Sequence, residues 1–188
     1  QQQEEVNWTP LESNPEVMTE YARALGLPDV YKFEDCLGLD EELLAMIPES
    51  TQAFILIYPY NEAQETRRDD EQKHLRFTSK EGAPWYMTQL VGNACGTIAL
   101  IHAIANTVPH DRLLQGSPLA NFFDHTKGLT PEDRGRALAK AKDLAEVHKL
   151  AAESGQTDSS QYAQVDYHFV CLCRVGDQLF ELDCARPS

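Results

Sequence analysis

Four residues have side chains and spacing that suit acyl-transfer chemistry: Gln89, Cys95, His168 and Asp183. Cys95 comes directly before an apolar run that is typical of a buried helix. A thiol at a helix start faces unsatisfied N–H groups and the positive end of the helix dipole, which favour the nucleophilic thiolate. Gln89, six residues earlier, carries a side-chain amide that can donate a hydrogen bond to a developing oxyanion.

His168 and Asp183 lie on two strand-like runs that flank the dipeptide Gly176-Asp177, a signal for a two-residue hairpin turn. In that register Val170 faces Asp183, so His168 and Asp183 are diagonal neighbours on one face, with Cα atoms roughly 7–8 Å apart. A carboxylate that orients an imidazole is the base half of a nucleophilic triad. A purely structural His–Asp hydrogen bond is the alternative.

Each of these residues taken singly has an ordinary interpretation. Cys95 alone could be a small buried hydrophobe, and Gln89 alone a surface residue. The order Gln, Cys, His and Asp, with the cysteine at a helix start and the other pair on one hairpin, is typical of a thiol protease.

A competing interpretation groups His168 with Cys171, Cys173 and Cys184 as a metal site. Strand parity argues against this grouping, because it places all three cysteines on the face opposite His168. Thiols with this spacing more often pack in a core as small hydrophobes. We therefore expect neither a metal nor a cofactor.

The elements that must position these residues indicate one mixed α/β domain over residues 1–188. Helices are expected at residues 14–26, 40–47, 98–108 and 130–152, and strands at residues 53–58, 165–175 and 178–183. The apolar run 53–58 lacks alternation, which predicts a strand covered on both faces. The polar stretch 61–73 is expected to be a solvated excursion, and residues 152–164 a flexible loop.

The net charge of the chain limits the kinds of partner that we expect. The 30 acidic residues outnumber 16 basic ones, for a formal charge of -14, and such a surface repels phosphate backbones and anionic lipids. We expect a protein or peptide partner with basic groups, and neither nucleic acid nor membrane. The first residues lack the features of a secretory signal, so reduced thiols are expected rather than disulfides.

Residues 93–106, with the sequence NACGTIALIHAIAN, closely resemble the nucleophile segment of the ubiquitin carboxyl-terminal hydrolases, the papain-like UCH cysteine peptidases of peptidase group C12. Residues 8–17 resemble the opening segment of that family, and residues 155–157 part of its crossover loop. Residues 165–169 and 179–183 resemble its histidine and aspartate strands. The resemblance runs from residue 8 to the end of the chain and indicates the short, single-domain subfamily.

The resemblance implies an α/β fold with a central antiparallel sheet flanked by helices and a crossover loop above the active site. It implies hydrolysis of small adducts or peptides from the C-terminal glycine of ubiquitin, with NEDD8 as a second candidate substrate. Cys95 would be the nucleophile, His168 the base and then the acid, and Asp183 its orienting partner, while Gln89 and the Cys95 N–H would hold the oxyanion. No cofactor is implied, and the expected form is a monomer in the cytoplasm, with the nucleus as a second location.

The resemblance also implies a set of ubiquitin-binding residues: Pro10, Leu11, Glu12, Asp35, Ala152, Gly155 and Gln156. The loop 152–164 would arch over the cleft and admit small or unfolded leaving groups but not a folded one. Family members continue past Ser188 with a further helix and a closing strand. We therefore expect either a trimmed enzyme or a truncated, catalytically impaired ubiquitin-binding protein of the same fold.

Overall fold

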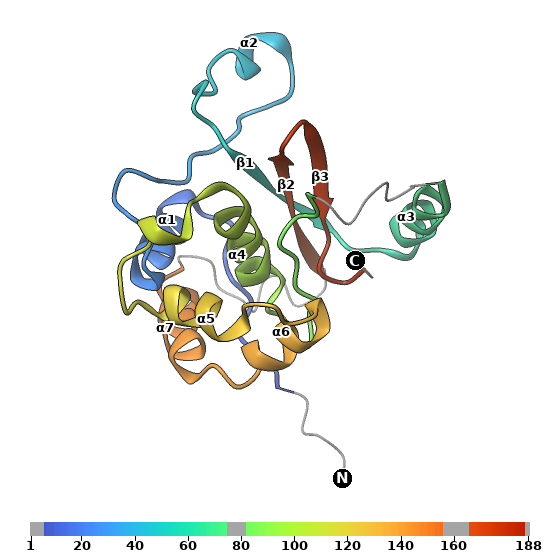
Figure 1. The fold of residues 1–188 in the computed structure, drawn as a ribbon. Helices are drawn as coiled ribbons and strands as arrows, with labels where there is room; N and C mark the ends of the chain where they lie inside the picture. The colour runs from blue at the N-terminus through green and yellow to red at the C-terminus, as the bar shows by residue number, and fades with distance from the viewer. Residues whose placement is uncertain (1–5, 75–81, 156–165, 187–188) are drawn as a thin grey trace.

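The computed structural model describes residues 6–74, 82–155 and 166–186. A three-stranded antiparallel sheet has the order β1-β2-β3 and consists of β1 (Ala53–Pro59), β2 (Tyr167–Val175) and β3 (Gln178–Leu182). The helical elements are α1 (Pro15–Leu25), α2 (Glu41–Leu44), α3 (Glu62–His74), α4 (Cys95–Thr107), the 3-10 turn η1 (His110–Arg112), α5 (Pro118–Thr126), α6 (Pro131–Leu138) and α7 (Lys142–Ser154). In Figure 1, α1 and α4 to α7 gather on one side of the sheet, whereas α3 stands apart from them near the C-terminus.

The β2–β3 hairpin has the predicted register. Val175 pairs with Gln178, so the loop between them is two residues long. Gly176 in this loop has a φ of 60°, a left-handed conformation that glycine adopts without steric cost. This confirms the predicted register as far as Leu182, whereas Asp183 comes directly after the last residue of β3.

The first helix begins and ends where the sequence predicts. The Asn14 side chain accepts hydrogen bonds from the backbone N–H groups of Glu16 and Val17, and Pro15 occupies the first helical position. Gly26 follows the helix with a φ of 113°, and a Cβ there would overlap the Ser117 hydroxyl. Glycine is therefore favoured at position 26 for two reasons: it adopts the left-handed conformation that ends the helix, and it leaves room for the segment that carries Ser117.

Strand β1 is less covered than predicted. Its residues alternate between half-buried and exposed, and Phe54 and Leu56 are among the exposed large hydrophobic residues. The strand pairs with β2 alone and forms an edge of the sheet in the described chain. The expectation of burial on both faces is therefore wrong, because a run of apolar residues does not reveal how many neighbours a strand has.

The predicted helix over residues 130–152 is two helices, α6 and α7. At the break, the backbone N–H groups of Lys140 and Ala141 bond to carbonyl oxygens three residues back, and the chain then turns. Neither glycine nor proline occupies this break, so the sequence carries no signal for it. Helix α5, which was not predicted, begins with Ser117 as its cap and Pro118 at its first position.

The polar stretch 61–73, expected to be a solvated excursion, forms α3 instead. Asn61 caps the helix by accepting a hydrogen bond from the Gln64 N–H at 3.0 Å. The helix has no apolar face, and most of its described side chains are exposed as expected, whereas its helical conformation was not predicted. Its contacts with the sheet are ionic. These contacts belong to the site described below.

The core is centred on α4, which is buried along most of its length and packs against β2. A polar network crosses this core: the Thr97 hydroxyl lies 2.9 Å from the Tyr21 hydroxyl and 2.7 Å from His148 Nδ1. His148 Nε2 in turn lies 2.7 Å from the Thr9 carbonyl oxygen. Burial lowers the pKa of His148, so its ring is neutral and can accept at one nitrogen and donate at the other. The network fastens the N-terminal segment to α1, α4 and α7.

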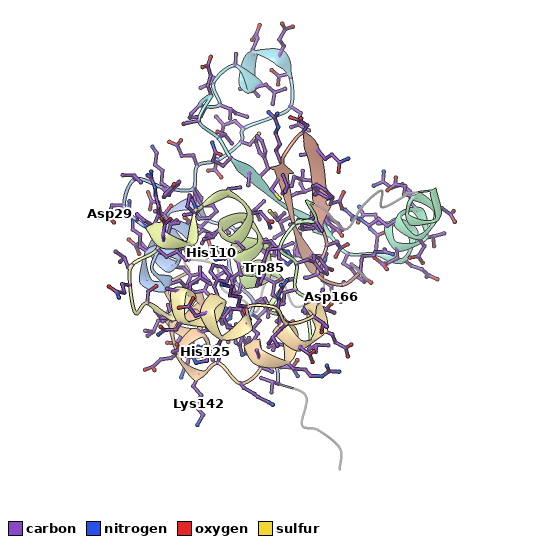
Figure 2. All side chains as sticks on the ribbon, viewed as in Figure 1. Asp29, Trp85, His110, His125, Lys142 and Asp166 are labelled. Atoms are coloured by element: carbon purple, nitrogen blue, oxygen red, sulfur yellow. The ribbon has the colours of Figure 1, made fainter. Side chains whose placement is uncertain are left out.

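Side chains fill the space between the ribbons. Figure 2 shows Asp29 and Lys142 at the rim of the molecule and Trp85 in its crowded centre, where this ring packs against the core. In the described part of the chain, no helix combines the length and apolar character required to cross a membrane.

Candidate active site

His168 and Asp183 form a buried hydrogen-bonded pair. His168 Nε2 lies 2.7 Å from Asp183 Oδ1, and the same oxygen accepts a hydrogen bond from the Ala185 N–H at 3.1 Å. Burial lowers the pKa of His168, but hydrogen bonds to Asp183 and Cys95 outweigh burial and raise that pKa to about 9. Burial raises the pKa of Asp183, yet the bond to His168 brings it below its usual value. The two shifts agree and describe an imidazolium beside a carboxylate.

Cys95 is the first residue of α4 and is buried. The turn that precedes it is tied to the N-terminal segment: Asn93 has a φ of 60°, and its side-chain amide donates to the Trp8 carbonyl oxygen at 3.0 Å. A Cβ on Gly92 would lie 1.7 Å from Asn7 Oδ1, so a larger residue here would displace the Asn7 side chain. The thiol is thereby held at the helix start, near enough to His168 to contribute to the raised pKa of that ring.

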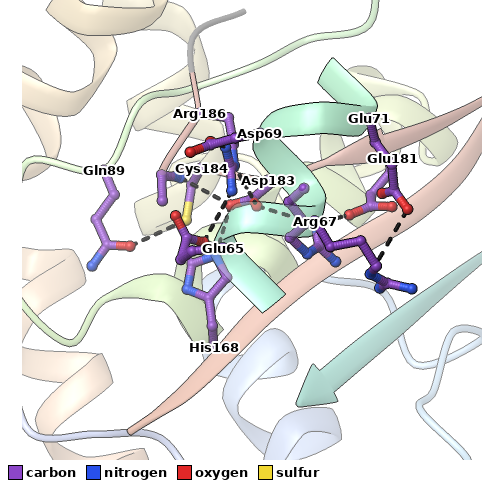
Figure 3. A network of polar contacts seen from close by, with 12 residues as sticks. Glu65, Arg67, Asp69, Glu71, Gln89, His168, Glu181, Asp183, Cys184 and Arg186 are labelled. Atoms are coloured by element: carbon purple, nitrogen blue, oxygen red, sulfur yellow. Dashed lines mark hydrogen bonds and ion pairs between the residues drawn. The ribbon is translucent and has the colours of Figure 1, made fainter. Parts of the chain in front are cut away.

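Gln89 lies beside Cys184. Its backbone N–H donates to the Cys184 carbonyl oxygen at 2.8 Å, and the Cys184 thiol donates to Gln89 Oε1 at 3.2 Å (Figure 3). Gln89 Nε2 donates to the Val91 carbonyl oxygen at 3.0 Å. Acceptor and donor ends of the amide are thus assigned by their partners, and Nε2 keeps a second hydrogen for a further acceptor.

Helix α4 also holds the segment that carries Gln89. The Met87 N–H donates to His102 Nε2 at 3.0 Å, and Asn106 exchanges two hydrogen bonds with the backbone of Trp85 at 2.7 and 2.9 Å. Burial lowers the pKa of His102 to about 3, which keeps its ring neutral and able to accept. The two α4 side chains, one turn apart, therefore set the position of Gln89 relative to Cys95.

Arg68 of α3 reaches the second oxygen of Asp183. Its Nη1 lies 3.3 Å from Asp183 Oδ2 and also pairs with Glu181, while the guanidinium lies 4.5 Å from the centre of the Tyr58 ring. The Arg68 side chain is only 13% exposed. Arg68 was not among the predicted site residues, because an arginine in a long polar run carries no signal for a buried partner.

Arg186 closes the network from the other side. Its Nη2 lies 3.0 Å from Glu65 Oε1, it also pairs with Asp69, and its Nε lies 3.7 Å from Asp183 Oδ2. Figure 3 shows Arg186 beside Asp69 and Asp183. The Tyr86 hydroxyl donates to the Asp183 carbonyl oxygen at 2.5 Å and so fixes the backbone of this turn.

Cys184 is not where strand parity placed it. Cys171 and Cys173 are buried in the core as expected, but Cys184 joins His168 and Asp183, and the ligand atoms of these three lie within 4.8 Å of one another. The prediction applied the in-and-out alternation of a strand to Cys184, but β3 ends at Leu182 and the next residues form a turn. Among the described residues, these three form the one group of histidine, cysteine and acidic side chains whose ligand atoms lie this close together.

The residues expected to bind ubiquitin fall into two regions. A Cβ on Gly155 would lie 2.4 Å from Glu12 Oε2, so the N-terminal segment meets the end of α7 there. Asp35 is exposed on a different segment, the connection from α1 to α2. The remaining predicted residues are the exposed Pro10, the buried Leu11, the half-buried Ala152 and Gln156, which lies outside the described residues together with most of the predicted loop 152–164.

Comparisons with known proteins show the family of this chain. The sequence model of ubiquitin carboxyl-terminal hydrolase, family 1, matches residues 8–188. A ubiquitin carboxyl-terminal hydrolase of Drosophila melanogaster is 38% identical over 95% of this chain and 78% of its own length. Ubiquitin carboxyl-terminal hydrolase 3 of Arabidopsis thaliana is 41% identical over 94% of this chain and 75% of its own length.

Solved structures share the fold. The catalytic domain of Trichinella spiralis UCH37, bound to ubiquitin vinyl methyl ester, has a TM-score of 0.71 and 26% identity over 97% of this chain and 76% of that one. A longer chain of the same protein, in complex with the same ester, has a TM-score of 0.68 and 24% identity, and this chain spans 64% of it. The α/β fold with its antiparallel sheet is therefore the UCH fold. With the family match over nearly all of its length and relatives above 30% identity, the chain belongs to the ubiquitin carboxyl-terminal hydrolase family of cysteine-type hydrolases.

Proposed function

We propose that this chain is a thiol peptidase that hydrolyses small adducts or peptides from the C-terminal glycine of ubiquitin. The hydrogen bond of 2.7 Å between His168 Nε2 and Asp183 Oδ1 carries the proposal. It engages one ring nitrogen and leaves Nδ1 for the Cys95 thiol, which contributes to the raised pKa of His168. Family membership and the ubiquitin ester bound to a protein of the same fold support the substrate class.

In the reactive form the Cys95 proton resides on His168, so the reaction begins from a thiolate beside an imidazolium, in line with the raised pKa of His168. The thiolate attacks the carbonyl carbon of the ubiquitin C-terminal glycine, and the imidazolium gives its proton to the leaving group as the bond to it breaks. Water, deprotonated by His168, then hydrolyses the thioester and releases ubiquitin. Asp183 remains ionised throughout and stabilises the imidazolium, in line with the raised pKa of His168.

Gln89 Nε2 and the Cys95 backbone N–H are the proposed donors to the oxyanion. The Cys184 thiol donates a hydrogen bond to Oε1 of the Gln89 amide, so a 180° flip of the amide would lose that hydrogen bond. Such donors stabilise the tetrahedral intermediate more than the planar substrate, because they are held in place before charge develops.

Ubiquitin recognition is proposed for the N-terminal segment at Pro10, Leu11 and Glu12, together with Gly155 at the end of α7. The contact between Glu12 and Gly155 supports this grouping. Ala152, Gln156 and the exposed Asp35 are proposed as further contacts, with Asp35 directed to a basic side chain of the ubiquitin tail. NEDD8 is a second candidate substrate.

The test is turnover of a fluorogenic ubiquitin C-terminal ester, together with labelling by ubiquitin vinyl methyl ester. We expect Cys95→Ala to abolish both turnover and labelling while ubiquitin affinity stays within about tenfold, because one side chain contributes little of the interface. Cys36→Ala, which changes an exposed thiol, is the matched control and keeps both activities. Binding of ubiquitin without turnover or labelling by the unmodified chain would instead identify an impaired binding protein.

A further inference from the structure

Helix α6 packs against the segment that carries Gln89. The Thr88 N–H donates to the Pro131 carbonyl oxygen at 3.1 Å, in the first turn of the helix. A Cβ on Gly135 would lie 2.3 Å from the Thr88 carbonyl oxygen, so the backbone of the helix comes directly against the segment. The residue before Gln89 is therefore held by α6, in addition to the contacts from α4 described above.

Arg134 adds a side-chain contact from the same helix. Its Nη1 donates to the Tyr86 carbonyl oxygen at 2.7 Å, and its guanidinium lies 4.7 Å from the centre of the Trp85 ring. A hydrogen bond from a charged donor is stronger than one between neutral groups, and an arginine over an indole ring gains a cation–π interaction. Arg134 therefore holds the two residues that begin the segment leading to Gln89.

The surroundings of Arg134 are unusual for an arginine. Among the residues that the structure describes, it contacts an aromatic ring and a carbonyl oxygen rather than a carboxylate, and its buried Nε has no hydrogen-bond partner. Burial lowers the pKa of Arg134, so the folded state disfavours the charge. The exposed Arg136 of the same helix, by contrast, pairs with Glu132 and Asp133. A role in positioning explains a buried guanidinium without an ion pair better than a role in stability does.

We propose that Arg134 is a positioning residue for this reaction: it holds Trp85 and Tyr86 in place, and with them Gln89 Nε2, the donor to the oxyanion. The inference deepens the proposed function and rests on it. Gln89 itself is held by Cys184, whose carbonyl oxygen accepts from its backbone N–H at 2.8 Å and whose thiol donates to its Oε1 at 3.2 Å. The segment is thus anchored at both ends, and movement of either end misplaces the donor. A misplacement of about 1 Å can lower a rate about 10²-fold.

The test is a double-mutant cycle between Arg134→Met and Gln89→Ala in the ubiquitin ester assay. Methionine keeps an unbranched apolar side chain beside Trp85 but removes the charge and the donor. With Gln89 present, we expect Arg134→Met to lower kcat about tenfold and to leave KM within about twofold. In the Gln89→Ala background the same change should lower kcat by less than about twofold, since no donor is left to misplace. Equal losses of kcat in the two backgrounds would overturn the proposal.

Arg136→Met is the matched control, because Arg136 is exposed on the same helix, and it should keep the kcat of the unmodified chain. If Arg134→Met does not fold, Arg134→Lys takes its place in the cycle. Lysine keeps the charge and a donor but lacks the planar guanidinium, so kcat should fall at least about threefold with Gln89 present and remain unchanged without it. A kcat equal to that of the unmodified chain would then contradict the positioning role.

Labelling by ubiquitin vinyl methyl ester separates a misplaced donor from general damage to the site. The Cys95 thiolate adds to a vinyl carbon of this probe, so no oxyanion forms on the attacked carbon. Arg134→Met should therefore be labelled within about twofold of the unmodified rate while its ester turnover falls about tenfold. Labelling and turnover that fall together would show a damaged nucleophile and overturn the proposal.

A further measurement does not depend on activity. The NMR signals of the Gln89 side-chain amide, assigned by their loss in Gln89→Ala, should shift in Arg134→Met and stay in place in Arg136→Met. Unshifted signals would overturn the positioning role whether or not the chain is a hydrolase. Absence of both turnover and labelling in the unmodified chain, with shifted Gln89 signals in Arg134→Met, would leave the contact standing and contradict only the proposed function.

Discussion

Arg68 Nη1 lies 3.3 Å from Oδ2 of Asp183, the carboxylate oxygen that His168 does not engage. The arginine comes from α3, which has no apolar face, and it also pairs with Glu181 beside β3. The helix is therefore joined to the sheet at this point through ion pairs in which Arg68 and Asp183 have low solvent exposure, whereas Glu181 is 44% exposed. The orientation of the Asp183 carboxylate depends on His168 and Arg68, together with the Ala185 N–H and Arg186.

We expect Arg68→Gln to lower kcat about tenfold with little change in KM. A charge-assisted hydrogen bond to a buried carboxylate is worth about 1.5–3 kcal/mol, and part of its loss appears as poorer orientation of His168. Arg68→Lys, which keeps the charge, should recover part of the rate. Arg67→Gln is the matched control, because Arg67 is exposed on the same helix and pairs with Glu71. Equal kcat values for the Arg68 and Arg67 variants would contradict a positioning role.

For Asp183→Asn, we expect a folded protein whose turnover of the ubiquitin ester is lower by several orders of magnitude, about 10⁴-fold as in serine triads. The amide cannot stabilise the imidazolium and favours the wrong ring tautomer. Asp177→Asn, in the exposed hairpin turn, is the control and should be unaffected. A loss of less than tenfold would mean that Asp183 only supports the structure around His168.

Gln89→Ala should lower kcat by about 10²–10³, the usual effect of the loss of one oxyanion donor. KM should change little, since this hydrogen bond strengthens only as the tetrahedral intermediate forms. Gln89→Glu removes the donor with almost no change in volume and should have a similar effect. Gln115→Ala, at an exposed turn, serves as control. A higher KM with unchanged kcat would assign Gln89 to substrate binding instead.

Asp35→Asn should weaken ubiquitin binding several-fold at low ionic strength and have less effect at high salt. An exposed charge pair is screened by salt, with a Debye length of about 10 Å at 0.1 M. Calorimetry on the Cys95→Ala background separates binding from turnover. Asp124→Asn, an exposed acidic residue of α5, controls for the loss of one negative charge. Unchanged affinity at low salt would remove Asp35 from the interface.

Stability should fall as the pH is lowered below about 6.5, in part because of His102. Burial lowers its pKa to about 3 in the folded state, while the unfolded chain takes up the proton near the usual value of 6.5. Between these values the unfolded state binds more protons, so this residue alone removes about 1.4 kcal/mol of unfolding free energy per pH unit. His102→Gln keeps an acceptor for the Met87 N–H and should show a shallower slope in urea unfolding between pH 7 and 5. Parallel slopes for the two proteins would contradict this account.

Local interactions account for what the sequence alone determined. The two-residue turn at Gly176 sets the register of the hairpin, and that register brings His168 to Asp183. The caps at Asn14 and Gly26 bound α1, and Cys95 stands at the start of a helix as expected. In each case the residues that decide the structure lie within a few positions of one another, or are related by the strict alternation of a strand.

The other contacts of the site depend on the tertiary structure. Their partners are far apart in the chain, and the sequence around one partner gives no indication of the other. Arg68 finds Asp183 across 115 positions, and nothing in the polar stretch around it distinguishes it from the exposed Arg67. The turn after β3 ends the strand alternation and brings Cys184 to His168. A side chain's type limits what it can bind, but which partner it meets depends on how distant elements pack, since ionic contacts and chain turns have no sequence period.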